Sequence, residues 1–452
     1  MEKTNRRLGF KLEQIKTKLI GGIMLLMSFF LCKNTFSLNI IYDEEAELYL
    51  QNLARPIFRA ANQPFNRNNF FIVNDDGLNA FVADGNALFI NTGTIISSDN
   101  DDEIAGVIAH EVGHIQGGHI LRGKLRQQEL SEVGLASMLL AGAAAVMSGR
   151  GDVGMAIMLG SQSSILNSYL SYMVEEERSA DEAGIKFLKE TQTSPEGMRN
   201  FMKKIAQQNI AEGIEETSYF RTHPVTKERL GFLDNAVKNS HYTGRNKTSE
   251  EFLRVKAKLI AFLYTPDTAL KYYPKNNTIP EKYAHTIIYF KQMKKQEAIN
   301  NINELIGLEP NNPFFRELKA QIFMETGDVK TAKKEYKKAL DLLPNSTLLK
   351  VSYAQATIED EPTSQELKEL ETMLNQAVFV RPSYEAWILL ARTYGMQNKL
   401  PEANYASAEG SFRLGLFDVA KKQANDALKG NSSPKLTLKI NDLINRIDEY
   451  KR

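Results

Sequence analysis

A pattern of small and apolar residues returns after 34 residues in the second half of the chain, and it restricts the fold strongly. Its first two copies are Ala298, Leu305 and Pro310, followed by Ala332, Ala339 and Pro344. Small residues let two helices approach closely, and each proline ends a helix because its ring cannot continue one. A unit of this length buries its apolar face against its neighbours, which predicts a helical solenoid. A generic helical bundle is the alternative.

Further copies extend the pattern with small shifts. The third copy is displaced by 38 residues instead of 34, which indicates an insertion near DEPTS at residues 360–364. Tyr336 and the residue order of the fourth copy match the tetratricopeptide repeat, so we expect an all-α tetratricopeptide-repeat domain at residues 266–452. The later positions are Leu370, Ala377 and Pro382, then Trp387, Leu390, Ala391, Tyr394 and Ala403, and last Ala420, Ala424 and Ala427.

The first 37 residues have the layout of a secretory signal peptide. Residues 1–18 carry six Lys and Arg, and the stretch 19–32 is mostly apolar. We expect cleavage after Ser37 and export to the periplasm. An uncleaved anchor helix is the alternative, although this stretch is short for a membrane span of about 20 residues. Cys32 is the only cysteine, and Leu31 before it is too large for a lipoprotein signal, so the exported protein must rely on its core or a metal for stability.

Residues 38–265 are predicted to form an α+β domain that is mostly helical. Residues 39–63 and 101–116 have helical periodicity, with acidic side chains near the start of each. Between them, residues 70–95 hold short runs of Phe, Val and Ile separated by Asp-Gly and Asn-Thr-Gly. This composition predicts a small antiparallel sheet of about three strands.

Residues 133–170 contain two long uncharged stretches on either side of SGRGD. They fit a buried helical hairpin of the core. They fit equally an exposed apolar lid or a hairpin that touches a membrane surface. Each half is under about 20 residues and rich in Gly and Ala, so we do not expect a transmembrane segment.

Residues 107–114 read VIAHEVGH. Because residues four apart share one face of a helix, His110 and His114 can present both imidazoles to one metal ion. Glu111 lies about 100° further round the helix and can reach a water beside that ion. Two histidines that bind zinc and a carboxylate that takes a proton from water are the requirements of a zinc hydrolase.

The third protein ligand must come from elsewhere in the chain. An extended motif would need a histidine at position 120, which is Ile120, so we give the neighbouring His119 a structural or flanking role. Further on, Glu177 and Asp181 are four residues apart and share a helix face. One of the two carboxylates can bind the metal, and the other can accept the free N–H of a ligating histidine. A charged, solvent-facing helix is the alternative.

HEVGH followed by Glu-x-x-Ala-Asp at residues 177–181 resembles the zinc metallopeptidase family that includes the CAAX prenyl-protease relatives. The resemblance implies that Glu177 is the third zinc ligand. Residues 79–93 resemble the strand that precedes the active-site helix in this family. YFRTHPVTKERL resembles its His-Pro element, with His223, Pro224 and Arg229. In periplasmic members that carry tetratricopeptide repeats, the histidine of this element can occupy the open metal position and hold the protease latent, which implies such a role for His223.

These features together predict a periplasmic zinc endopeptidase for protein quality control. Glu111 acts as the base, Asp181 and His223 support the site, and Arg229 is a candidate stabiliser of the developing oxyanion. We expect unfolded or misassembled proteins to dock as an added strand along Ala87 to Asn91. By resemblance, the clients are outer-membrane β-barrel proteins and the partners are the machinery that inserts them.

Two other functions are compatible with the sequence. One is a chaperone or scaffold whose metal site is usually plugged, and the other is an inner-membrane protease if residues 133–170 insert. The charge balance of 56 Lys and Arg against 55 Asp and Glu gives no indication of nucleic acid as a partner.

Overall fold

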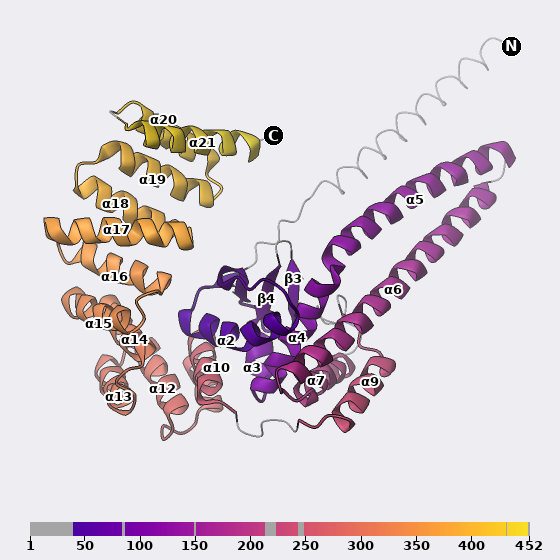
Figure 1. The fold of residues 1–452 in the computed structure, drawn as a ribbon, viewed down its shortest axis with the longest axis horizontal. Helices are drawn as coiled ribbons and strands as arrows, with labels where there is room; N and C mark the ends of the chain where they lie inside the picture. Colours follow the sequence, from indigo (N-terminus) through magenta and orange to yellow (C-terminus); the bar gives the residue numbers. More distant parts are fainter. Residues whose placement is uncertain are drawn as a thin grey trace, which may run out of the picture. The chain divides into compact units, whose positions relative to one another are not determined.

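The computed structural model describes residues 39–83, 86–148, 151–212, 223–242, 248–430 and 432–450. The predicted signal peptide at residues 1–37 lies outside this part. The described chain is mostly helical, with one small sheet near its start and helical repeats over its second half (Figure 1). This is the α+β region followed by an all-α solenoid that the sequence predicts. Within the described residues, no helix combines the length and apolar character that a membrane crossing requires.

The sheet has four strands, which are β1 (Ile40–Ile41), β2 (Phe70–Val73), β3 (Ala80–Ala83) and β4 (Ala87–Asn91). Their order is β1-β2-β4-β3. The prediction of a purely antiparallel sheet is wrong, because β2 and β4 are parallel while the two outer pairs are antiparallel. The chain leaves β2, forms β3 at the outside and returns as β4 between them. The prediction of a free edge along Ala87 to Asn91 is therefore also wrong, since β4 is paired on both sides.

Eight helices accompany the sheet in the first part of the described chain, and two of them carry the HEVGH and Glu177 motifs. Helix α4 begins where the Asn100 side chain accepts a hydrogen bond from the Glu103 backbone N–H, with three acidic residues in the first turn. It packs along α6. The helices are α2 (Glu44–Ala60), α3 (Thr92–Ser97), α4 (Asp101–Gly117), α5 (His119–Ser148), α6 (Gly151–Glu190), α7 (Glu196–Glu212), α9 (Lys227–Lys238) and α10 (Glu250–Leu263).

Helices α5 and α6 run side by side as a long pair (Figure 1). The predicted core, lid or membrane hairpin at residues 133–170 falls on this pair, but nearly all of its side chains lie outside those described. On the described half of α5, four apolar side chains are exposed, namely Leu121, Leu125, Val133 and Met138. This half of α5 therefore places apolar side chains in contact with solvent.

The repeat region consists of consecutive helices, each packed on the next. Of the residues that defined the 34-residue period, Ala298, Leu305, Ala332 and Ala339 are fully buried, as helix contacts at those positions require. The helices are α11 (Pro266–Tyr272), α12 (Ile279–Lys291), α13 (Lys295–Leu308), α14 (Pro313–Glu325), α15 (Val329–Leu342), α16 (Thr347–Glu359), α17 (Ser364–Val380), α18 (Tyr384–Met396), α19 (Leu400–Arg413), α20 (Phe417–Leu428) and α21 (Pro434–Tyr450).

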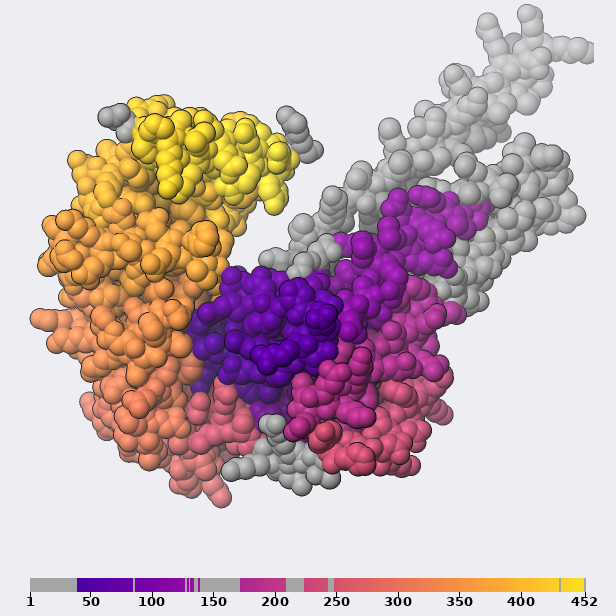
Figure 2. Space-filling model, in the orientation of Figure 1, coloured from indigo at the N-terminus to yellow at the C-terminus, as the bar shows by residue number. Residues whose placement is uncertain are grey.

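One hydrophobic core runs from α2 through the sheet and α4 into the first repeat helices. It joins Tyr49 and Phe252 to Tyr283 and Phe315 without interruption at residue 265. Figure 2 shows the surface of the first described residues, in indigo, against the orange surface of the repeats. The domain boundary at residues 265 and 266 stays a prediction, because buried residues on both sides of it share this core.

Candidate metal centre

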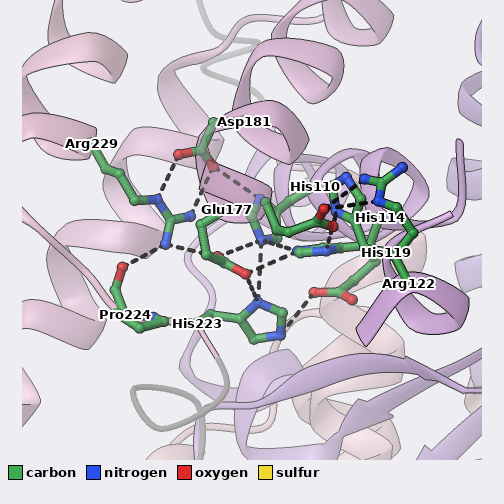
Figure 3. Close-up of polar contacts among 11 residues, drawn as sticks. His110, His114, His119, Arg122, Glu177, Asp181, His223, Pro224 and Arg229 are labelled. Carbon is green, nitrogen blue, oxygen red and sulfur yellow. Dashed lines mark hydrogen bonds and ion pairs between the residues drawn. The ribbon is translucent and has the colours of Figure 1, made fainter. Parts of the chain in front are cut away.

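Helices α4 and α6 and the segment before α9 bring four potential metal ligands together (Figure 3). One ligand atom from each of His110, His114, Glu177 and His223 lies within 4.8 Å of the others, and all four side chains are buried. The approach of the helices depends on Gly113, where an added Cβ would lie 2.6 Å from the Ala180 carbonyl oxygen. The structure thus brings together the two motifs that the sequence singled out.

Asp181 fixes the orientation of His110. Its Oδ1 atom lies 2.9 Å from His110 Nδ1, so this edge of the ring faces the carboxylate and the Nε2 edge faces the cluster. His110 Nε2 lies 3.3 Å from Glu177 Oε2, and His114 Nε2 lies 3.2 Å from Glu177 Oε1. Both histidines therefore direct the same ring nitrogen toward Glu177, with Asp181 behind His110 in the supporting position expected from the sequence.

Arg229 holds the two carboxylates of α6 in place. Its Nε and Nη2 atoms donate to both Asp181 oxygens at 2.7 and 2.9 Å. Its Nη1 atom lies 2.8 Å from Glu177 Oε2 and donates to the Pro224 carbonyl at 2.7 Å. The guanidinium is only 3% exposed. This geometry favours a supporting role behind Glu177, and the oxyanion role stays a prediction.

Electrostatics distinguish the two HEVGH histidines. Burial lowers the pKa of His114 to about 3, so this imidazole stays neutral, as a metal ligand must. Burial would also lower the pKa of His110, but hydrogen bonds with Asp181 and Glu177 outweigh it and raise that pKa to about 10. A proton on His110 thus balances buried carboxylate charge, and a divalent cation in the cluster would take over that positive charge.

Glu111 lies beside the cluster with a fully buried carboxylate. Burial raises its pKa, and His223 and His110 only partly offset this effect. Neither oxygen has a hydrogen-bond partner in the described part of the chain. An orphaned buried carboxylate is costly, and it is what a site for a metal-activated water requires. The donor set of two histidines and one glutamate also suits zinc, so the residues present fit a divalent metal.

His223 reaches the cluster from the segment before α9. Its Nδ1 atom lies 2.9 Å from Glu177 Oε1 and 3.4 Å from His110 Nε2, while its Nε2 atom lies 3.7 Å from Glu111 Oε1. The residues just ahead of it, 213–222, lie outside the described chain. His223 is therefore placed where a fourth ligand would be.

The structure also shows what surrounds His119, which the sequence gave a structural or flanking role, and adds two residues that the sequence did not single out. His119 lies 2.8 Å from His114, nitrogen to nitrogen, and Glu176 and Arg122 adjoin it. Glu176 had no separate signal, because it stands within a run of three glutamates before Arg178. The Gly-Gly pair between His114 and His119 was the one available sign that the chain turns back here.

An apolar pocket of about 330 Å³ opens beside Glu111, His114 and Glu177. Edge strand β3 contributes Phe81 and Val82 to its wall. The remaining apolar lining is Ile120, Tyr172 and Met173. A peptide that reached the cluster would therefore pass along β3.

Comparison with known proteins agrees with this geometry. The model of peptidase family M48 matches residues 44–237. A beta-barrel assembly-enhancing protease of Yersinia pestis is 24% identical over 415 residues, covering 89% of this chain and 83% of that protein. The protein of that name from Escherichia coli (strain K12) is 26% identical over 414 residues, covering 89% and 82%.

The metalloprotease LoiP of Escherichia coli (strain K12) is 28% identical over 153 residues, which cover 34% of this chain and 56% of that protein. The match of the family model spans both helices that carry the cluster, and similarity to the assembly-enhancing proteases continues through the repeats. Residues 44–237 match peptidase family M48, and the chain is a metalloprotease with tetratricopeptide-like helical repeats behind these residues.

Proposed function

We propose that this metalloprotease is a periplasmic zinc endopeptidase of protein quality control, and that it cleaves misassembled outer-membrane β-barrel proteins. The observation that carries the proposal is the buried cluster of His110, His114 and Glu177 beside the unsatisfied carboxylate of Glu111. Similarity over most of the chain to two beta-barrel assembly-enhancing proteases supports this class of client. The periplasmic location rests on the signal-like residues 1–37.

In this proposal each side chain has a separate task. His110, His114 and Glu177 hold the ion, which supplies Lewis acidity toward a carbonyl group and toward water. Glu111 takes a proton from the attacking water and later gives it to the leaving amine, a task that suits a carboxyl group whose pKa burial has raised. Asp181 and Arg229 keep His110 and Glu177 oriented.

The scissile segment binds as an extended strand along β3. This strand lies at the edge of the sheet, and its residues Phe81 and Val82 line the pocket beside Glu111. Main-chain hydrogen bonds to a strand edge recognise extended chain irrespective of most side chains. An unfolded barrel protein supplies such segments, whereas a folded one keeps them paired.

Metal analysis and digestion of an unfolded barrel protein by residues 38–452 test this function. We expect about one zinc per chain and cleavage. Glu177→Gln should lose most of the metal, whereas Glu111→Gln should keep it and fail to cleave. A Glu111→Gln variant that cleaves at the normal rate would remove Glu111 from the mechanism. Normal zinc in Glu177→Gln would point to another third ligand.

His223 restrains the site in this proposal. Its imidazole lies among the three ligands, within reach of the open position of the metal. We therefore expect His223→Ala to raise proteolysis, including cleavage of the protease itself. Unchanged or lower activity in matched preparations would instead make His223 a positioning or transition-state residue.

A chaperone role with a mostly latent site is the second candidate, and the extent of the repeats favours it. A solenoid offers a broad surface for a client or for the assembly machinery. If Glu111→Gln restores barrel assembly in cells as well as the unchanged protein does, chaperoning is the main activity. If it does not, proteolysis is.

A further inference from the structure

His119 and its neighbours form a second polar group behind the metal cluster. In Figure 3, His119 and Arg122 lie beyond His114, while Asp181 and Arg229 lie beyond His110. His119 Nδ1 lies 2.8 Å from His114 Nδ1 and 3.0 Å from Glu176 Oε2. Arg122 donates to Glu176 Oε1 through Nε at 3.1 Å and Nη2 at 2.6 Å. His119 and Glu176 are both buried.

The turn between α4 and α5 brings His119 back over the end of its own motif. Gly118 caps α4 in the left-handed region at φ 67°, which reverses the chain so that α5 begins at His119. A Cβ on Gly117 would lie 2.1 Å from His119 Nε2. Two glycines are therefore needed for the ring of His119 to pack against that of His114, at a centroid distance of 4.8 Å.

A neutral imidazole carries one proton on one of its two nitrogens. In the contact between the two Nδ1 atoms, one nitrogen must therefore donate a hydrogen bond and the other must accept it. If His114 uses Nε2 to hold a metal, its proton is on Nδ1 and needs an acceptor. Among the described residues, His119 Nδ1 lies within hydrogen-bond distance of that atom and supplies the acceptor. The proton of His119 must then be on its Nε2 atom.

The opposite arrangement is available when no metal is bound. His119 Nδ1 then carries the proton, 3.0 Å from the Glu176 carboxylate, whose charge Arg122 balances. His114 Nδ1 becomes the unprotonated partner, and the proton of His114 sits on Nε2, facing Glu177 Oε1 at 3.2 Å. Each ring keeps one proton in both arrangements, and both protons change sides between them.

We propose that His119 is a positioning residue for the metal site. It accepts a hydrogen bond from the Nδ1–H of His114 and so fixes the tautomer in which His114 Nε2 binds metal. His119 does for His114 what Asp181 does for His110. The two residues differ in one respect. The carboxylate of Asp181 can only accept hydrogen bonds, whereas His119 changes its own tautomer when the metal binds. This inference rests on the proposed metal function of His110, His114 and Glu177.

Two substitutions with side chains of nearly equal shape test whether His119 acts as a hydrogen-bond acceptor or only through packing. In His119→Asn, the side-chain oxygen takes the place of Nδ1 and still accepts a hydrogen bond from His114. The leucine side chain in His119→Leu has no hydrogen-bond acceptor. We expect His119→Leu to weaken zinc binding about 10- to 100-fold, as loss of a group behind a ligand typically does. His119→Asn should stay within a few-fold of the unchanged protein. Affinity is measured by competition with a chelator, independently of proteolysis.

The outcomes distinguish this inference from the proposed function. An unchanged protein that binds no zinc contradicts the proposed function itself. An unchanged protein that binds zinc, with equal affinity in both variants, overturns only the role of His119. Equal weakening in both variants also overturns it, since packing and not the acceptor would then matter. If His119→Leu does not fold, Gly117→Ala replaces it, because the added methyl displaces the His119 ring.

Nitrogen-15 spectra of the histidine side chains supply a readout that a packing role would not change. The chain has six histidines, and the signals of His119 are identified by their loss in His119→Asn. We expect His119 to carry its proton on Nδ1 without metal and on Nε2 after zinc is added. A tautomer that stays the same through the titration with zinc overturns the proposal.

Discussion

Arg229 joins the two carboxylates that α6 presents to the site. Because the side chain is buried and its donors reach Asp181, Glu177 and the Pro224 carbonyl, removing it takes the main cation from Asp181 and one charged neighbour from Glu177. A buried carboxylate that loses its positively charged partner lowers the stability of the folded protein, because the interior solvates charge poorly. The residue therefore contributes to the stability of the site before any substrate binds.

Replacing Arg229 by Met should destabilise the metal-free protein by about 3–5 kcal/mol, the usual cost of breaking a buried pair. Urea unfolding in the presence of a chelator measures the change. Arg178→Met on α6 is the matched control, since Arg178 forms an exposed pair with Glu182 that is worth about 0–1 kcal/mol. A stable Arg229→Met variant with full zinc content and lost turnover would instead favour the oxyanion role.

Much of the candidate site follows from helical periodicity alone. His110 and His114, and likewise Glu177 and Asp181, are each four residues apart and so share a face. The position of His223 came only from resemblance, because a residue between helices has no periodicity to place it. The link from His114 to His119 could not be predicted, since it depends on the left-handed turn at Gly118.

Among the elements, edge strand β3 is where the proposed substrate strand would pair. Asn91 N–H donates to the Asn79 carbonyl, so residues 79, 81 and 83 direct their backbone groups toward β4. The backbone N–H and C=O of Val82 consequently face the open edge. The side chain of Val82 also lines the pocket beside Glu111. Val82 is thus the residue of β3 best placed to pair with a bound strand.

Val82→Pro should reduce cleavage of an unfolded barrel protein at least about tenfold, mainly through KM. The proline removes the outward N–H but no hydrogen bond to β4. Val82→Ile is the control, because it keeps the backbone donor and the apolar wall. Steady-state digestion with both variants supplies the comparison. Normal KM for Val82→Pro, with zinc bound, would mean that substrate does not pair with β3.

Strands β2, β3 and β4 were predictable, but β1 at Ile40–Ile41, within residues predicted to be helical, and the strand order were not. Runs of Phe, Val and Ile marked β2, β3 and β4, and Asp-Gly and Asn-Thr-Gly looked like hairpin turns between neighbours. The placement of β4 beside β2 depends on contacts between residues distant in sequence, which local patterns do not report. The repeats were easier, because buried residues such as Ala298, Ala332 and Ala377 mark the helix contacts of successive units.

At the scale of the whole molecule, protease and repeats share one core. Helix α10 contributes Phe252, Val255 and Ile260 to it and packs on α12, the first long repeat helix. Acidic residues at the start of α2 also reach the repeats, with Glu47 bound to Arg381 by two hydrogen bonds of 2.6 and 2.9 Å. The repeats are therefore supported by residues that precede the predicted boundary.

A fragment of residues 248–452 should be more stable than one of residues 266–452, and neither should need zinc. The longer fragment keeps α10 and with it the apolar cover of α12. Thermal unfolding followed by circular dichroism, with and without a chelator, measures both fragments. Equal midpoints would show that α10 contributes little, and unfolding on chelation would contradict an independent repeat fold.

Glu317 on α14 provides the last prediction, at the junction of α2 and the repeats. Burial raises its pKa to about 7 from 4.5, against the attraction of Lys258 and with Asp43 and Glu45 adding to the rise. Its Oε2 atom is buried and accepts no hydrogen bond from the described residues. Since the folded protein binds this proton more tightly than the unfolded chain does, stability falls as the pH rises from 4.5 to about 7 and stays low above.

Glu317→Gln should remove this loss of folding stability at higher pH. At about pH 8 we expect the variant to be more stable than the unchanged protein by about 1–3 kcal/mol, because one pKa unit corresponds to about 1.4 kcal/mol and partial exposure reduces the effect. At about pH 4 the two proteins should be nearly equal, since both carry an uncharged side chain at this position. Urea unfolding across this range measures the difference, with Glu325→Gln on the exposed face of the same helix as the control. A gain in the free energy of unfolding that does not depend on pH would mean that the charge of Glu317 does not destabilise the folded protein.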